Sequence, residues 1–154
     1  MKQKELVIEP MKISDLIDIM AIEQQSYPNP WPLHLFVTEL KDNKYSCYLV
    51  LRHESKIIAY GGMWVFVKEA HITNLAVDPN FRNQGYGGIV LKSLMEEAGK
   101  RGAGNVSLEV RVSNYTAKKL YNKYGFSVVD VRKEYYRNED ALFMSVSLEG
   151  LKNI

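Results

Sequence analysis

Apolar residues recur along this chain with two periods, and each change of period marks the border of an expected helix or strand. Apolar side chains three and four residues apart predict a first helix after Ser14 and a second from Leu33 to Leu40. The same spacing predicts a long helix from about Gly87 to Arg101 and a shorter one between Asn114 and Gly125. Ser14 and Asn114 are expected to cap their helices, because their side-chain oxygens can accept from the free N–H groups of a first turn. The first helix is expected to bury one broad face, formed by Leu16, Ile17, Ile19, Met20 and Ile22.

Runs rich in β-branched and aromatic residues predict the strands. A short strand is expected near Leu6 to Glu9, and three further runs joined by short polar turns predict an antiparallel meander. These runs span Tyr45 to Arg52, Lys56 to Val67 and His71 to Val77. Gly61 and Gly62 lie inside the middle run, where glycine weakens a strand, so we expect a bulge or close packing there.

Residues Asn105 to Val112 alternate strictly between apolar and polar side chains. One face of this expected strand carries four apolar side chains, and the other carries Ser107, Glu109 and Arg111. A buried strand would not normally present two charges on its second face. Residues 126–131 and 141–146 then predict a closing pair of strands. The pattern therefore predicts an α+β (mixed α/β) fold, with helices on both faces of one mostly antiparallel sheet of six to seven strands.

Composition adds mainly exclusions. The 154 residues, 46% of them hydrophobic, fit a single domain over residues 1–154. Twenty basic residues against 18 acidic ones, interspersed, give no electrostatic case for nucleic acid or an anionic membrane as a partner. No signal peptide is recognisable and the longest apolar run, Ile57 to Val67, is too short to cross a membrane, so a cytoplasmic location is expected by default. The lone Cys47 and the three scattered histidines, which are expected to be solvated or hydrogen-bonded, imply no metal site.

The stretch FRNQGYGG, residues 81–88, places three glycines at the start of the long helix. Free N–H groups and the helix dipole favour an anion there, and glycine allows phosphate oxygens to approach. A loop that simply requires positive φ would have the same composition. Two phosphate motifs are excluded: Leu91 precedes Lys92-Ser93 where a P-loop requires glycine, and Val90 stands where a dinucleotide fingerprint requires its third glycine.

The pattern Arg82-x-x-Gly85-x-Gly87, directly after Asp78-Pro79, resembles the pyrophosphate loop of the GCN5-related N-acetyltransferases (GNAT), which bind acetyl-coenzyme A (acetyl-CoA). The resemblance implies a sheet that splays between its fourth and fifth strands, where backbone groups of Leu75, Ala76 and Val77 hold the pantetheine arm. Asn114 is a further candidate for pantetheine, although a helix cap alone would explain it. The implied pyrophosphate site comprises Arg82, Asn83, Gln84, Gly85, Tyr86, Gly87 and Gly88.

The likeness covers most of the chain and is densest from residue 72 to 144. Four segments resemble the bacterial ribosomal-protein alanine N-acetyltransferases. They are LEVRVSN at residues 108–114, Leu120-Tyr121, Gly125-Phe126 and Arg132-x-x-Tyr135-Tyr136. This subgroup acetylates the N-terminal residue of a protein, so the implied partner is a protein N-terminal peptide, most of all alanine of a small-subunit ribosomal protein. The loops that form its peptide groove correspond to Tyr27 to Trp31 and Tyr135 to Asp140 here. Ordinary packing would also explain Trp31, and the second loop is short. The candidate substrate-binding residues are Tyr27, Trp31, Tyr135 and Tyr136.

Acetyl transfer from a thioester to an amine requires one base and one acid. An α-amine must lose a proton to attack, and the departing thiolate benefits from receiving one. Glu109 and Tyr121 coincide with the base and the acid of the resembling subgroup. A salt-bridged carboxylate and a core tyrosine are the alternative interpretations. Glu109 is a weak base unless burial raises its pKa or a water relays the proton, so it can also act by holding the amine.

Two other functions fit the same residues. The fold can acetylate a small amine or a lysine side chain, because fold does not determine the acceptor. A coenzyme A-binding module without turnover is the third hypothesis, and the presence of both Glu109 and Tyr121 argues against it. With no cysteine or serine nucleophile paired to a base, direct attack in a ternary complex is predicted.

The two assignments predict different kinetic defects. Replacing Gly87 by valine is expected to weaken acetyl-CoA binding at least tenfold, because a side chain blocks the N–H groups of the helix start. Tyr121→Phe is expected to lower kcat at least tenfold and leave cofactor affinity unchanged. Calorimetry and steady-state rates on both variants check this, and the reverse pattern would refute the assignments.

Overall fold

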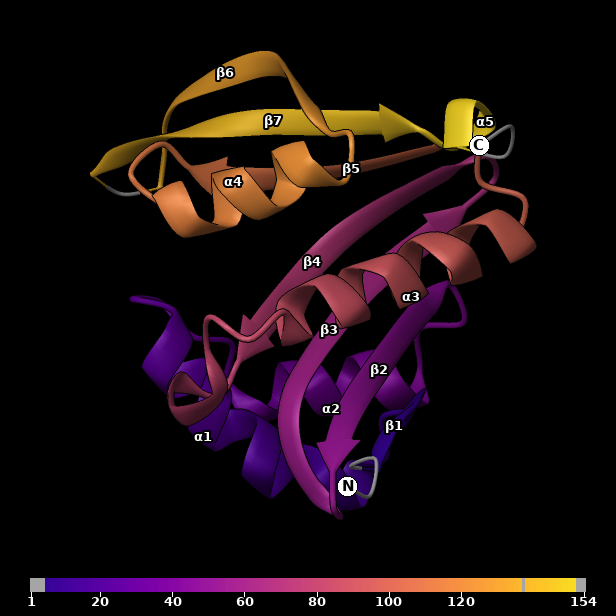
Figure 1. The fold of residues 1–154 in the computed structure, drawn as a ribbon, viewed down its shortest axis with the longest axis vertical. Helices are drawn as coiled ribbons and strands as arrows, with labels where there is room; N and C mark the ends of the chain where they lie inside the picture. Colours follow the sequence, from indigo (N-terminus) through magenta and orange to yellow (C-terminus); the bar gives the residue numbers. More distant parts are fainter. Residues whose placement is uncertain (1–4, 137, 152–154) are drawn as a thin grey trace. The chain divides into compact units, whose positions relative to one another are not determined.

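In a computed structural model, the described residues, 5–136 and 138–151, form a mixed α/β fold with seven strands. Their order in the sheet is β1-β2-β3-β4-β5-β7-β6, and of the pairings described here only that of β4 with β5 is parallel. The predicted fold class is confirmed. The strands are β1 Leu6–Pro10, β2 Ser46–His53, β3 Lys56–Phe66, β4 Glu69–Val77, β5 Asn105–Arg111, β6 Ser127–Tyr136 and β7 Glu139–Ser147. The helices are α1 Leu16–Ser26, α2 Leu33–Lys41, α3 Tyr86–Lys100, α4 Tyr115–Lys123 and the short α5 Leu148–Leu151, with 3₁₀ turns at Ile13–Asp15 and Pro79–Phe81 (Figure 1).

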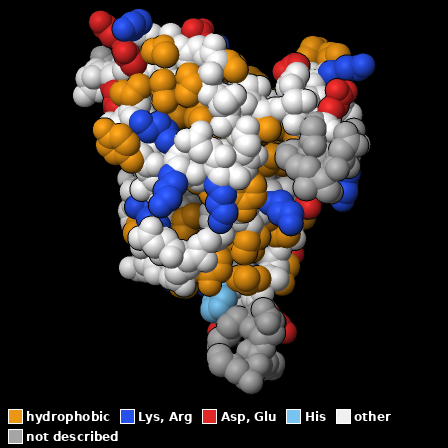
Figure 2. Space-filling model, turned by 45° about the horizontal axis from the view of Figure 1, so that its top comes forward, with side chains coloured by type: hydrophobic (Ala, Val, Ile, Leu, Met, Phe, Trp, Pro, Cys, Tyr) orange, Lys and Arg blue, Asp and Glu red, His pale blue; other side chains and the backbone are white. Residues whose placement is uncertain are grey.

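The chain groups into two compact units. The first comprises Met1–Trp64 and Thr73–Leu94, and the second comprises Val65–Ile72 and Met95–Ile154. On the face shown in Figure 2, lysine and arginine side chains are separated by neutral and hydrophobic ones. No helix among residues 5–136 and 138–151 is both long and apolar enough to cross a membrane.

The first unit has helices on both faces of its strands. β1, β2 and β3 pair antiparallel, with Ile8 opposite Leu51 and Leu49 opposite Gly61. A side chain at Gly61 would meet Val90 and Leu94 of α3, whereas one at Gly62 would meet the ring of Tyr48. Since successive residues of a strand face opposite sides, α3 covers one face, and the helices packed with Tyr48, α1 and α2, cover the other.

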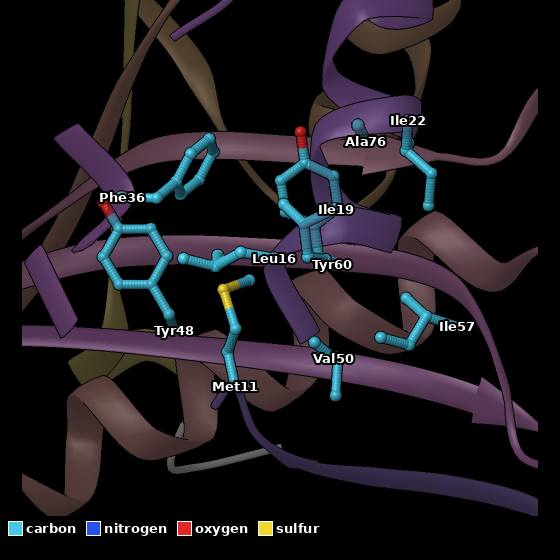
Figure 3. Packing of buried hydrophobic residues seen from close by; sticks show 10 residues of the cluster. All are labelled: Met11, Leu16, Ile19, Ile22, Phe36, Tyr48, Val50, Ile57, Tyr60 and Ala76. Atoms are coloured by element: carbon cyan, nitrogen blue, oxygen red, sulfur yellow. The ribbon is translucent and has the colours of Figure 1, made fainter. Parts of the chain in front are cut away.

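The core of the first unit is rich in aromatic rings (Figure 3). Phe36 of α2 lies edge-on to both Tyr48 and Tyr60, with ring centroids 6.3 Å apart in each pair. Ile19 and Ile22 of α1 are buried in the same cluster. This packing, rather than helix propensity, fixes α1 and α2 against the strands.

Two details of α1 differ from the prediction. Ser14 is not the cap, because it lies inside the 3₁₀ turn, where the Asp15 carboxylate accepts from the N–H of Lys12 at 2.9 Å. Ile17 does not belong to the buried face, since 84% of its surface is exposed. A helix face that packs on a sheet is narrower than the run of five apolar positions had indicated.

The second unit is built around β5. Val106, Leu108 and Val110 are buried, as the alternation predicted. β5 pairs antiparallel with β7 along its whole length, and its start pairs in parallel with Glu69–His71 of β4. That parallel register contains three pairs and ends at His71 opposite Ser107. Asn114 caps α4 as predicted, with its Oδ1 accepting from the N–H of Ala117 at 3.1 Å.

The glycine pair in β3 is explained by close packing and not by a bulge, because the register shift of this pairing lies further along the strand, where Ile57 and Ala59 face Arg52 and Leu51. A Cβ on Gly62 would lie 2.0 Å from Cε2 of Tyr48, a ring held in the aromatic core. Only glycine therefore fits at this position.

Gly62→Ala is expected to lower the free energy of unfolding by about 2–3 kcal/mol, because the Tyr48 ring must move within a packed core. Gly99→Ala is the matched control: its Cβ would meet only Leu148 at 3.9 Å, and alanine is the better helix former, so a gain of about 0.5 kcal/mol is expected. Urea unfolding of both variants measures the difference. Equal midpoints would contradict the packing argument.

Candidate active site

The loop between β4 and α3 offers free backbone donors. Asn83 has φ 63° and Gly85 has φ 86°, so the chain turns through the left-handed region just before the helix. The first backbone hydrogen bond of α3 runs from the N–H of Ile89 to the carbonyl of Gly85 at 3.3 Å, so the N–H groups of residues 86–88 precede the hydrogen-bonded part of the helix. A Cβ on Gly85 would have no atom within 4 Å. The loop is an open set of donors at the positive end of a helix dipole, which suits an anion.

Tyr27, just after α1, is bonded to the backbone of β4. Its hydroxyl donates to the carbonyl of Leu75 at 2.7 Å and accepts from the N–H of the same residue at 3.1 Å. The N–H of Asp78 donates to Ile58 of β3, and backbone groups of successive extended residues alternate in direction. The groups of Leu75 and Val77 therefore point away from β3.

Arg82 engages the same backbone edge. Its Nε donates to the carbonyl of Val77 at 3.0 Å, and a terminal nitrogen donates to Oγ of Ser26 at 3.2 Å. Ala76 is buried in the aromatic core. Asn74 lies two residues before Ala76 in β4, and among the described residues its Oδ1 is the one buried side-chain oxygen or nitrogen atom that has no hydrogen-bond partner. An acceptor that lacks a donor is a position where a ligand N–H is favourable.

Trp31 is held by the core of the first unit. Its ring centroid lies 5.2 Å from that of Phe36 and 6.4 Å from that of Tyr48, and its backbone N–H donates to the buried Glu23 carboxylate at 2.9 Å. Glu23 also accepts from the hydroxyl of Tyr60. Packing accounts for the position of Trp31, and its contact with substrate stays a prediction.

Glu109 lies between the side chains of His71 and Arg132 in the second unit. Its Oε1 is 2.8 Å from Nε2 of His71, and its Oε2 is 3.4 Å from Arg132 of β6. Burial alone would raise the pKa of the Glu109 carboxyl, but the hydrogen bond and charge of His71 and the charge of Arg132 lower it below its usual range. Glu109 is therefore ionised at neutral pH, and burial does not make it a stronger base.

Tyr121 of α4 is buried against Phe126, with ring centroids 5.7 Å apart. Burial, and next the neighbouring Tyr136, raise the pKa of its hydroxyl. Tyr136 in turn has its pKa raised to about 12 by burial and by the charge of Glu109. In the second unit, Tyr136 therefore interacts electrostatically with both Glu109 and Tyr121.

The hairpin of β6 and β7 positions the other predicted aromatic residues. Tyr135 and Tyr136 lie edge-on to each other at 5.2 Å, and the Arg111 guanidinium lies 4.2 Å from the Tyr136 ring centroid. Glu139 fixes this end of the hairpin, since it accepts from Arg111 and from the N–H of Ser113. The strands end at Tyr136 and begin again at Glu139, so the loop is short as predicted, although its Arg137 lies outside the described residues.

His71 is the site residue that sequence reasoning did not single out. It was expected only to be solvated or hydrogen-bonded, and the structure gives it hydrogen bonds to Glu109 and to Oγ of Ser107, each at 2.8 Å. The sequence signal for a partner of Glu109 was the polar face of β5. Which residue of β4 faces it depends on the register between β4 and β5, and the sequence does not specify that register. No group of three or more histidine, cysteine, aspartate or glutamate side chains that could hold a metal ion occurs within residues 5–136 and 138–151.

Comparison with known proteins gives consistent matches. The family model of the acetyltransferase (GNAT) family matches residues 16–126. The [ribosomal protein bS18]-alanine N-acetyltransferase of Escherichia coli K12 is 34% identical over 147 residues, which is 92% of this chain and 97% of that protein. A Bacillus subtilis protein provisionally given the same name is 38% identical over 143 residues, 92% of this chain and 95% of its own length.

Solved structures agree with this fold. The crystal structure of the ribosomal-protein-S18-alanine N-acetyltransferase from E. coli matches with a TM-score of 0.86 and 32% identity, and covers 93% of this chain and 94% of that one. Ard1 from Thermoplasma volcanium matches with a TM-score of 0.85 at 23% identity over 92% of this chain and 97% of its own, which shows the fold alone.

Arg132→Gln is expected to raise the pKa of Glu109, because the carboxyl stays buried while one cation that favours its ionised form is removed. A carboxyl carbon NMR titration of Glu109 measures the change. Lys133→Gln is the matched control, since Lys133 is mostly exposed and pairs with Asp140 at 3.8 Å instead. An unchanged Glu109 titration in Arg132→Gln would show that the ion pair does not act on this carboxylate.

Proposed function

The chain belongs to the GNAT family of acetyltransferases, and we propose that it transfers the acetyl group of acetyl-CoA to the α-amino group of a protein N-terminus. The proposed substrate is the one named for its relatives, the N-terminal alanine of ribosomal protein bS18. The observation that carries this proposal lies in the second unit, where a carboxylate held ionised, Glu109, and a phenol held protonated, Tyr121, share the neighbour Tyr136.

The loop before α3 fits the pyrophosphate of acetyl-CoA. The N–H groups of residues 86–88 at the start of α3, the open space over Gly85 and the nearby Arg82 provide donors and positive charge for an anion. We propose Asn83, Gln84, Tyr86, Gly87 and Gly88 as the remaining contacts, chiefly through their backbone. The resemblance stated from the sequence and this donor set support the same assignment.

The pantetheine arm is proposed to pair with the backbone of Leu75 to Val77. Tyr27 and Arg82 occupy these groups in the structure, and the hydroxyl of Tyr27 both donates to Leu75 and accepts from it. An amide offers the same pair of a donor and an acceptor, so we propose that the bound arm takes the place of the Tyr27 hydroxyl. Asn114 stays a proposed contact through groups that its capping oxygen leaves free.

Glu109 is proposed to bind and orient the α-amine. An ionised, partly buried carboxylate attracts the ammonium form, and a hydrogen bond from nitrogen to Glu109 directs the nitrogen lone pair. The sequence left open whether burial raises the basicity of Glu109. The lowered pKa of Glu109 gives no support for a stronger base, so we propose that Glu109 orients the amine and does not retain its proton.

Tyr121 is proposed to stabilise the departing thiolate. The phenol has a raised pKa and therefore keeps its proton at neutral pH, whereas a thiol has a reference pKa of about 8.5. Complete transfer from Tyr121 to the thiolate would be uphill. A hydrogen bond that strengthens as negative charge develops on sulfur avoids this cost and acts mainly in the transition state.

The acetyl group is proposed to pass directly from sulfur to nitrogen. Two side chains could in principle accept the acetyl group before the amine does, and both are buried. Cys47 is buried in β2, and Ser107, whose hydroxyl contacts His71, has 9% of its surface exposed. Direct attack requires both substrates to be bound at once. The proposed peptide contacts are the aromatic residues of the two loops, Tyr27, Trp31, Tyr135 and Tyr136.

Mass spectrometry of peptides incubated with acetyl-CoA tests the function. A peptide that begins with a free alanine is expected to gain one acetyl group at its N-terminus, with kcat/KM at least 100-fold above that for an N-terminally blocked peptide containing lysine. Acetylation of lysine side chains or of polyamines instead would show that the enzyme acts on another class of amine. Absence of transfer to every acceptor would contradict the enzymatic function.

A further inference from the structure

We propose that Glu23, a buried carboxylate of α1, is a positioning residue for the acceptor peptide, which it affects by fixing the loop between α1 and α2. This inference rests on the proposed function and deepens it, because two of the proposed peptide contacts, Tyr27 and Trp31, belong to that loop. Glu23 touches no substrate in this scheme. It acts through the conformation of residues 27–32.

The loop has few backbone donors of its own. Residues 27–32 read YPNPWP, and they lie between the end of α1 at Ser26 and the start of α2 at Leu33. The three prolines carry no N–H, so only Tyr27, Asn29 and Trp31 can donate from the backbone. Such a segment cannot hold its shape through a ladder of its own hydrogen bonds. Acceptors from outside the loop must supply part of its stability.

Glu23 accepts from both ends of the loop. Its backbone carbonyl accepts from the N–H of Tyr27 at 3.2 Å, where α1 ends. Oε2 of its carboxylate accepts from the backbone N–H of Trp31 at 2.9 Å. A single residue therefore fixes the first and the fifth residue of this proline-rich segment.

The other carboxylate oxygen ties the loop to the sheet. Oε1 of Glu23 accepts from the hydroxyl of Tyr60 in β3, whose ring is fully buried in the aromatic core (Figure 3). Burial, and next the neighbouring Tyr27 and Glu23, raise the pKa of the Tyr60 hydroxyl, so the phenol keeps the proton that it donates. The acceptor of the Trp31 N–H is therefore itself held in place by the core of the first unit.

A carboxylate at this position is explained by what it binds. Only 1% of the surface of Glu23 is exposed, and burying a carboxylate is unfavourable unless donors satisfy it. Packing alone would be served as well by an apolar side chain of similar volume. The hydrogen bond to the loop is the property that such an apolar side chain would lack.

A fixed loop lowers the free-energy cost of binding a peptide. Tyr27 and Trp31 are packed against the core cluster, so their side chains are held before any peptide arrives. Without the bond to Glu23, part of the binding free energy would be spent on ordering the loop, and the peptide KM would rise. Glu109 and Tyr121 belong to the second unit, so kcat would not follow.

Glu23→Met tests this role, because methionine keeps the volume and removes the acceptor. The KM for a peptide that begins with alanine is expected to rise about tenfold, with kcat and acetyl-CoA affinity unchanged. A residue needed only for folding would lower the active fraction, and so the apparent kcat, without changing KM. Glu39→Met is the matched control, since Glu39 is a buried carboxylate of the same unit that accepts from Trp64 at 2.6 Å. Its peptide KM is expected to equal that of the wild type.

Two further variants keep the test valid if Glu23→Met folds poorly. Glu23→Gln retains one accepting oxygen and is expected to show a smaller rise in peptide KM than Glu23→Met. Glu23→Met can also be compared within a Tyr60→Phe background, where no buried phenol loses its acceptor. The same rise of about tenfold in peptide KM is expected between these two proteins.

Hydrogen exchange of the Trp31 backbone amide gives a readout that does not need activity. The exchange is expected to be at least tenfold faster in Glu23→Met than in the wild type, because the amide loses its acceptor. An unchanged exchange rate, or a Glu23→Met enzyme with the wild-type peptide KM, would overturn the role of Glu23 alone. A wild-type enzyme that acetylates no peptide would overturn the proposed function and this role with it.

Discussion

The parallel register of β4 and β5 determines which polar side chains meet at the site. With His71 opposite Ser107, the imidazole lies beside Ser107 and next to Glu109, one side-chain repeat further along the same face of β5. A shift by one residue would turn the polar face of β5 toward the core and bury two charges. The ladder has only three pairs, so the buried valines and leucine of β5, through its long pairing with β7, must stabilise this register.

The first unit depends in the same way on a small number of packed aromatic side chains. Gly62 exists as glycine because the Tyr48 ring fills the space of its side chain, and the Tyr48 hydroxyl reaches Thr73 of β4 at 2.9 Å. Tyr27 adds a second bond from the helical layer to β4, at Leu75. Tyrosine suits these positions because its ring fills the core while its hydroxyl satisfies a polar group that burial would otherwise leave without a partner.

Much of the fold was predictable because its signals are local. The alternation in β5, the glycine turn and the Asn114 cap each depend on residues close in sequence, and each is found where it was expected. The cap of α1 was assigned to Ser14 instead of Asp15, and Ile17 was assigned to the core, because the angle at which a helix meets a sheet is not encoded locally. For the site, the sequence indicated the residue types. The partners of Glu109 come from β4 and β6, 38 positions before it and 23 after it, and only the strand order brings them together.

The charges around Glu109 bear on which amine the enzyme accepts. The contacts with His71 and Arg132 lower the pKa of Glu109, which makes this carboxylate a better binder of ammonium and a weaker base. An α-amine has a reference pKa of about 7.7–8.0 and a lysine side chain about 10.4, which makes the neutral α-amine roughly 300-fold more abundant near neutral pH. A strong base would reduce this advantage. Under the proposed function, a weak base at this position preserves the advantage of an α-amine over a lysine side chain, because the Glu109 carboxylate cannot deprotonate the more basic lysine ammonium.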